Sequence, residues 1–231
     1  MDSGQEYVDT SGAEPVRGFL HTPSAPDGEG LVLTHSAGGN CQAPLLVAVA
    51  DAFCAAGLTV LRCDLPFRQA RPHGPPMRTA ERDQGGLRAA VEAMRRTLGG
   101  GRGAGRIFLG GHSYGGRMTS ILAAGEPGLV DALLLLSYPL HPPRQPQQLR
   151  TQHFPKLQTA ALFVSGVRDG FGTVAEIEAA LRLIPARARL LTVEGAGHEL
   201  LSKRNGDALP GLIVEAFGDF IAKADNPGRR R

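Results

Sequence analysis

Short apolar runs alternate along this chain with longer stretches in which apolar residues recur every three or four positions. The short runs predict strands at 16–21, 30–34, 58–61, 107–109, 132–136, 160–164 and 189–193, with residues 6–9 pairing with the first of them. The three-to-four periodicity predicts helices at 44–56, 79–98, 117–124, 175–183 and 209–222. Alternating strands and helices of this kind indicate an α/β fold with a mostly parallel central sheet and helices on both faces.

The connections between these elements are the second feature of the pattern. Residues 65–78 hold several Pro and Arg and are expected to form a loop, and Thr79 is expected to cap the helix that follows. No insertion is long enough to build a cap domain, and no internal repeat is visible. The 231 residues are therefore expected to form one domain, 1–231.

Composition and charge exclude several classes of protein. The formal net charge is +3, without a basic stripe, so no nucleic-acid partner is expected. The longest apolar run, Ala132–Leu136, is too short to span a bilayer, and the N-terminus lacks the order of a signal peptide. Neither zinc-type spacing nor a phosphate-binding loop is present, so no metal and no cofactor are expected.

The number and spacing of the cysteines indicate the redox state of the compartment in which the protein is expected. Cys41, Cys54 and Cys63 are an odd, sparse set, which favours free thiols in a reducing cytoplasm over disulfides. We therefore expect a soluble cytoplasmic protein. A catalytic Cys41 remains an alternative, but the chain offers a better nucleophile.

That nucleophile lies in the run Gly111-His112-Ser113-Tyr114-Gly115, which matches Gly-x-Ser-x-Gly. The pattern suits a serine on a sharp strand-to-helix turn, because larger side chains at the glycine positions would collide with neighbouring backbone. Here it follows an apolar strand and opens a helix, as the motif requires. The alternative is an ordinary glycine-rich turn. The sequence favours Ser113 as the nucleophile of a serine hydrolase.

The partners of Ser113 are expected further along the chain, first an acid and then a histidine. Asp169 follows the strand at 160–164, and His198 follows the strand at 189–193. Both lie past the carboxyl ends of strands, where open α/β sheets place their sites. Glu194 competes with Asp169, but it is too close to His198 in the chain. Ser113, His198 and Asp169 are therefore the predicted catalytic triad.

A tetrahedral intermediate also needs two hydrogen-bond donors for its oxyanion. One predicted donor is the backbone N–H of Tyr114, the residue after the nucleophile. The other is the backbone N–H of Ala37, in the loop that follows Thr34.

These residues together resemble the α/β hydrolases of the dienelactone-hydrolase-like branch. The resemblance runs from about Leu31 to Leu200, and it is closest to the hydrolase-like domains of testis-expressed proteins and a subunit of the NSL chromatin complex. It rests on runs 34–40, 64–68, 110–117, 137–143, 166–172 and 197–198; Ser36 stands where the branch usually has glycine. The resemblance implies the α/β-hydrolase fold and the triad, but no particular substrate.

Five further side chains are expected on the catalytic side and are candidates for binding substrate: His35, Arg68, Tyr138, His141 and Phe171. The alternative for Arg68 and His141 is that they satisfy loop carbonyls or pair with nearby acids.

The function expected from these residues is hydrolysis of a small-molecule carboxylic ester through an acyl-enzyme intermediate. Without a cap the site should be shallow and open. Two alternatives stay open: a non-catalytic interaction module on the same fold, and a lactone, thioester or peptide hydrolase. The sequence makes no prediction of oligomeric state.

Overall fold

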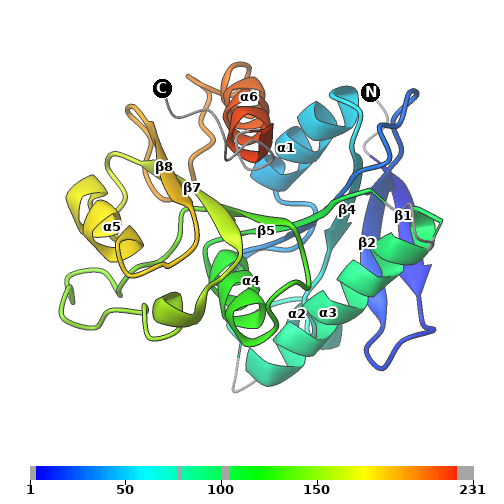
Figure 1. The fold of residues 1–231 in the computed structure, drawn as a ribbon, viewed down its shortest axis with the longest axis horizontal. Coiled ribbons are helices and arrows are strands. Elements are labelled where there is room, and N and C mark those ends of the chain that lie inside the picture. Colours follow the sequence, from blue (N-terminus) through cyan, green and yellow to red (C-terminus); the bar gives the residue numbers. More distant parts are fainter. Residues whose placement is uncertain (1–3, 77–79, 100–104, 223–231) are drawn as a thin grey trace.

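A single mixed sheet organises the described part of the chain. The computed structural model describes residues 4–76, 80–99 and 105–222. Within them eight strands are ordered β1-β2-β4-β3-β5-β6-β7-β8 (Figure 1). β1 pairs with β2 and β2 with β4 antiparallel, and all other neighbours are parallel. The strands are β1 (Gln5–Asp9), β2 (Val16–His21), β3 (Gly30–Thr34), β4 (Thr59–Cys63), β5 (Ile107–His112), β6 (Ala132–Leu136), β7 (Ala160–Gly166) and β8 (Ala188–Val193).

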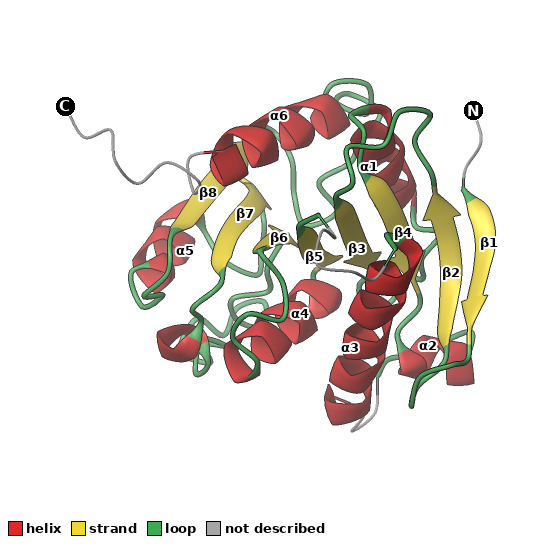
Figure 2. Ribbon diagram, turned by 45° about the vertical axis from the view of Figure 1, so that its right-hand side comes forward, coloured by secondary structure: helices red, strands yellow, loops and turns green. Residues whose placement is uncertain are grey.

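Helices cover both faces of this sheet. α1 (Pro44–Ala55) and α6 (Leu209–Ala222) pack on one face, and α3 (Ala80–Thr97), α4 (Tyr114–Gly125) and α5 (Val174–Leu181) pack on the other (Figure 2). The short helices are α2 (Pro66–Ala70) and the 3₁₀ turn η1 (Phe154–Lys156). In the described ranges, no helix has the length and apolarity needed to cross a membrane.

The central strands are apolar because both of their faces are buried. β6 reads Ala-Leu-Leu-Leu-Leu, and every residue in it is buried. Successive side chains of a strand point to opposite faces. Leu133 and Leu135 accordingly join the core under α3, α4 and α5, whereas Leu134 and Leu136 join the core under α1 and α6. A continuous apolar run therefore serves two hydrophobic cores.

The predicted architecture is confirmed. All of the expected strands are present, and β1 pairs with β2 as predicted, in an antiparallel arrangement. The expected helices are present as well, with ends that differ by a few residues. Among the described residues no cap domain covers the carboxyl ends of the strands (Figure 2). The loops after β3, β5, β7 and β8 consequently meet at one open edge.

One segment was predicted wrongly. Residues 65–78 are not a loop throughout, because α2 begins at Pro66. Proline is tolerated in the first turn of a helix, where its missing N–H has no partner to lose. The helix also buries Phe67 and Arg68, which an open loop would expose. The η1 turn was not predicted. Thr79, the expected cap of α3, lies outside the described residues.

Candidate active site

Ser113 lies at the turn between β5 and α4 with a strained backbone. Its φ is 52° and its ψ is −113°, a conformation that non-glycine residues rarely adopt. A Cβ at Gly111 would lie 2.5 Å from the Gly115 carbonyl carbon, and one at Gly115 would lie 2.5 Å from the His35 oxygen. The flanking glycines thus allow the close approach that the tight turn needs.

A chain of hydrogen bonds joins Ser113 to the two predicted partners. The Ser113 hydroxyl donates to Nε2 of His198 at 2.8 Å. The Nδ1–H of His198 donates to the Asp169 carboxylate, whose oxygens lie 2.9 and 3.0 Å away. These contacts fix a tautomer in which Nε2 of His198 can accept the serine proton.

Asp169 is held firmly in the loop after β7. Its side chain is buried, and one of its oxygens also accepts the Phe171 N–H at 2.8 Å. The backbone N–H of Arg168 donates to the Ala196 carbonyl at 2.9 Å, which ties this loop to the one that carries His198. Glu194, the competing acid, is exposed at the start of that second loop. Asp169, and not Glu194, therefore contacts the imidazole.

Two aromatic rings flank His198. Phe171 stacks on it with ring centroids 4.1 Å apart and planes 29° from parallel. The ring of His112 lies with its centroid 5.5 Å from that of His198, and its Nε2–H donates to the His198 carbonyl at 3.0 Å. Burial lowers the pKa of His112, which favours its neutral form. Phe171 holds the imidazole ring, and His112 holds the backbone that carries it.

The loop of residues 35–40, which we call the 35–40 loop, lies beside the nucleophile turn. The N–H of Gly115 donates to the His35 carbonyl at 3.1 Å. This bond brings the residue after Tyr114 against the start of the loop that contains Ala37. Ser36 is not among the described residues with a left-handed backbone, so glycine is not required there.

Four of the five proposed substrate contacts have their polar atoms engaged within the protein. Buried His35 donates through Nδ1 to the Ser36 carbonyl and accepts the Leu65 N–H at Nε2. Tyr138 donates its hydroxyl to the Arg150 carbonyl, and His141 donates through Nδ1 to the Pro142 carbonyl. Arg68 donates to several carbonyls, as described below. For Arg68 and His141 this geometry favours the alternative of satisfying loop carbonyls.

Phe171 differs from the other four candidates. Its ring is partly exposed and lies directly on His198. Phe171 is therefore the candidate whose ring stacks on the imidazole of a predicted triad residue.

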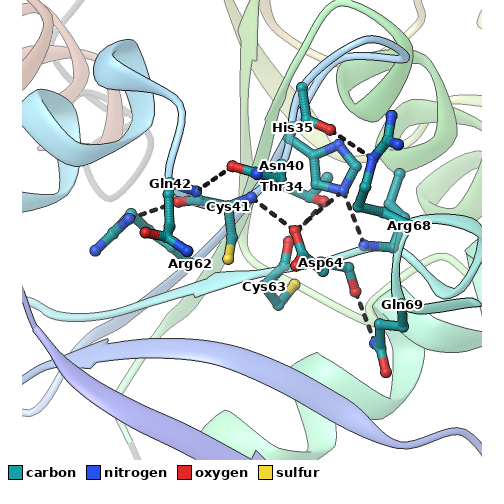
Figure 3. A network of polar contacts seen from close by, with 12 residues as sticks. Thr34, His35, Asn40, Cys41, Gln42, Arg62, Cys63, Asp64, Arg68 and Gln69 are labelled. Carbon is teal, nitrogen blue, oxygen red and sulfur yellow. Dashed lines mark hydrogen bonds and ion pairs between the residues drawn. The ribbon is translucent and has the colours of Figure 1, made fainter. Parts of the chain in front are cut away.

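Sequence reasoning missed Asp64, which anchors the far end of the 35–40 loop (Figure 3). One of its carboxylate oxygens accepts the Cys41 N–H at 2.7 Å and lies 3.5 Å from Nε2 of His35. Asp64 directly follows β4, so its place at the carboxyl end of a parallel strand was the signal that could have found it.

Sequence reasoning also missed Asp83, in α3. It is fully buried and accepts hydrogen bonds from the Tyr114 hydroxyl and the Phe67 N–H. It therefore joins α3 to the residue that follows the nucleophile. Nothing in the helical pattern around it marks this role.

Comparisons with known proteins agree with this architecture. A family model described as "Alpha/beta hydrolase domain" matches residues 27–221. A dienelactone hydrolase from Anabaena variabilis is similar, with TM-score 0.71 and 22% identity over 94% of this chain and 99% of that one. Est1E from Butyrivibrio proteoclasticus, solved with ferulic acid, has TM-score 0.74 and 17% identity over 94% and 99%. A lidless serine hydrolase, XC6422 from Xanthomonas campestris, has TM-score 0.68 and 18% identity over 98% and 97%.

Proposed function

This chain belongs to the α/β hydrolase domain family, and from that premise we propose that it is a serine hydrolase that cleaves carboxylic esters through an acyl-enzyme intermediate. The observation that carries the proposal is the hydrogen-bonded chain from Ser113 through His198 to Asp169. A serine becomes a nucleophile when a correctly oriented base accepts its proton, and this arrangement supplies base and orienting acid together.

The reaction follows from the positions of the protons. Nε2 of His198 accepts the Ser113 proton while Oγ forms a bond to the ester carbonyl carbon. The imidazolium then gives that proton to the alkoxy oxygen as the carbon–oxygen bond breaks, and the alcohol leaves. Water attacks the acyl-enzyme with His198 again as base, which releases the acid and restores Ser113. Asp169 stabilises the imidazolium in both halves.

The oxyanion of each tetrahedral intermediate is assigned to the backbone N–H groups of Tyr114 and Ala37. Tyr114 opens α4, where the positive end of the helix dipole also favours negative charge. Ala37 belongs to the 35–40 loop, which the Gly115–His35 hydrogen bond holds beside the turn. A donor of this kind is worth about 3 kcal/mol of transition-state stabilisation.

The substrate class is a small or extended ester with a short acyl group. Supporting this, the described residues place no lid over Ser113. Two cavities of about 640 and 410 Å³ are lined by other parts of the chain and include none of the three triad residues. An open, shallow site offers little apolar surface to a long acyl chain. Est1E, with ferulic acid, and dienelactone hydrolase share the fold, which is compatible with an ester or lactone substrate.

Two finer assignments belong to the same proposal. The motifs in runs 34–40, 110–117 and 137–143 support placing the chain near the testis-expressed and NSL-subunit domains. The free thiols of Cys41, Cys54 and Cys63 support a reducing cytoplasm as its location.

Turnover of p-nitrophenyl acetate and butyrate by the wild-type protein and by Ser113→Ala tests the proposal. We expect hydrolysis by the wild type and none above background by the variant, with Ser24→Ala, a change at an exposed serine, as control. Equal rates in wild type and Ser113→Ala would refute it. A fluorophosphonate probe separates the non-catalytic alternative, because folded protein that is not labelled at Ser113 has no activated serine.

A further inference from the structure

Arg68 is a buried cation whose hydrogen-bond partners, within the part of the chain that the structure describes, are all backbone carbonyls. Its Nε donates to the Gly39 carbonyl at 2.8 Å, and one terminal nitrogen donates to the Ala37 carbonyl at 2.8 Å. The guanidinium also donates to the carbonyls of Gly74 at 3.1 Å and Arg71 at 3.3 Å. Burying an arginine without a carboxylate is costly, and these bonds offset that cost. Of the four carbonyls, two belong to the 35–40 loop.

The carbonyls that are held determine the direction of the Ala37 N–H. In a trans peptide the N–H points opposite to the carbonyl of the preceding residue. The Ser36 carbonyl accepts from His35 Nδ1 at 2.8 Å and from the Gly39 N–H at 3.2 Å. This fixes the peptide that contains the Ala37 N–H. Arg68 fixes the next peptide through the Ala37 carbonyl. With both peptides held, neither backbone torsion of Ala37 is free to turn.

Arg68 is also linked through the Phe67 ring to the side chain of Tyr114, the residue that supplies the other proposed oxyanion donor. Its guanidinium is 5.0 Å from the centroid of the Phe67 ring. That ring meets Tyr114 edge-on, with centroids 5.7 Å apart and planes at 88°. A continuous set of contacts thus runs from the Ala37 carbonyl through Arg68 and Phe67 to Tyr114.

We propose that Arg68 is a positioning residue for the oxyanion hole. It holds the peptide that follows Ala37 by the Ala37 carbonyl, which prevents rotation about Ala37 and keeps the Ala37 N–H facing the tetrahedral intermediate. This inference rests on the proposed ester hydrolysis at Ser113. Arg68 acts through the backbone and touches no substrate. Its removal should therefore weaken transition-state stabilisation and leave ground-state binding nearly unchanged.

The test compares Arg68→Ala and Arg68→Lys with the wild type on p-nitrophenyl butyrate. We expect kcat to fall about 10- to 100-fold in Arg68→Ala, with KM within about 2-fold. Lysine lacks the planar fork and should recover only part of kcat. Guanidinium added at millimolar concentration should raise kcat of Arg68→Ala several-fold and leave Ser113→Ala inactive. Arg71→Ala, an exposed arginine of the same segment, is the matched control and should keep wild-type kcat.

Three results would overturn the inference. The first is a kcat for Arg68→Ala within about 2-fold of wild type. The second is a rise in KM alone, which would mark Arg68 as a substrate contact. The third is a loss of kcat that guanidinium does not relieve in a variant that melts well below the wild type, which would mark Arg68 as a purely structural residue.

Amide hydrogen exchange separates failure of this inference from failure of the proposed function. If Arg68 holds the loop, amides at 35–40 exchange faster in Arg68→Ala than in wild type, whether or not an ester is hydrolysed. Faster exchange together with an inactive wild type would leave the loop contact standing and refute the proposed function. Unchanged exchange together with an active wild type would refute the role of Arg68 alone.

Discussion

The ring of Phe171 stacks on the imidazole of His198, with centroids 4.1 Å apart and planes 29° from parallel. The same residue donates its backbone N–H to Asp169, so it contacts both proposed partners of the nucleophile. The backbone contact is independent of the side chain. Replacing the ring by a small side chain therefore removes the stack while leaving the Asp169 hydrogen bond in place.

We predict that Phe171→Ala lowers kcat by about 2- to 10-fold, because aromatic pairs contribute about 0.5–1.5 kcal/mol beyond the area they bury. The imidazole should lose orientation but keep its carboxylate partner. Phe171→Tyr keeps a stacking ring and should retain most of the activity. Steady-state kinetics on p-nitrophenyl esters measures both variants, and an unchanged kcat in Phe171→Ala would show that the stack does not orient His198.

Replacing Asp169 by Asn tests the acid of the triad. The Asn amide can donate to Nδ1 of His198, which would favour the tautomer with its proton on Nε2, where it cannot accept from Ser113. We expect kcat to fall by a factor on the order of 10⁴.

The matched control is Glu194→Gln, which changes the acid that competed for this role in the sequence. Its side chain is exposed, and kcat should stay at the wild-type value. A large loss in Glu194→Gln with little in Asp169→Asn would reverse the assignment.

The expectation that Ser113, His198 and Asp169 lie together came from short-range rules, and the three residues are hydrogen-bonded in the structure. The Gly-x-Ser-x-Gly run specifies a turn through steric contacts within five residues, and the order of Ser113, Asp169 and His198 follows from strand ends that share one edge of the sheet. Both kinds of information are present in local periodicity and glycine positions.

The missed features depend on contacts between distant segments. Residues 65–78 were predicted as a loop from their Pro and Arg content, yet α2 forms because Phe67 and Arg68 are buried by neighbours elsewhere in the chain. The bonds from Arg68 to the Ala37 and Gly39 carbonyls join residues about 30 positions apart. No periodicity encodes such a pairing, so the sequence left open whether Arg68 contacts substrate or satisfies loop carbonyls.

Thiol reactivity tests the competing role of Cys41. Burial raises the pKa of its thiol to about 12, and burial also raises the pKa of Cys63. Cys54, on α1, is partly exposed. We expect the folded protein to release thionitrobenzoate from Ellman's reagent at Cys54 alone, and at all three cysteines after unfolding. Rapid modification of Cys41 in the folded state, with loss of activity in Cys41→Ala, would restore it as a nucleophile.

Two buried histidines, His35 and His112, and the partly buried His153 should make stability depend on pH just below neutrality. Burial lowers the pKa of His35, His112 and His153, and for His153 burial and the nearby Arg117 charge together lower the pKa to about 4. In the unfolded chain a histidine titrates near about 6.5. The unfolded state therefore binds more protons as pH falls from about 6.5 toward about 4, and folding stability is lost over that range.

His153→Gln isolates one of these groups. Glutamine can still donate to the Ser120 hydroxyl, which lies 2.8 Å from Nε2 of His153, but it does not titrate. Urea denaturation at about pH 7 and about pH 5 measures the free energy of unfolding of both proteins. We expect this free energy to fall from the higher to the lower pH in both. The fall should be smaller in the variant than in the wild type, by about 1 kcal/mol after allowance for solvent screening. His73→Gln, at an exposed histidine, should leave the pH dependence unchanged. The carboxyl groups of Glu126 and Glu176, whose pKa values are lowered by their hydrogen bonds, titrate mostly below this window and add little to it. If the wild type and His153→Gln lose equal stability between the two pH values, His153 is not a source of the pH dependence.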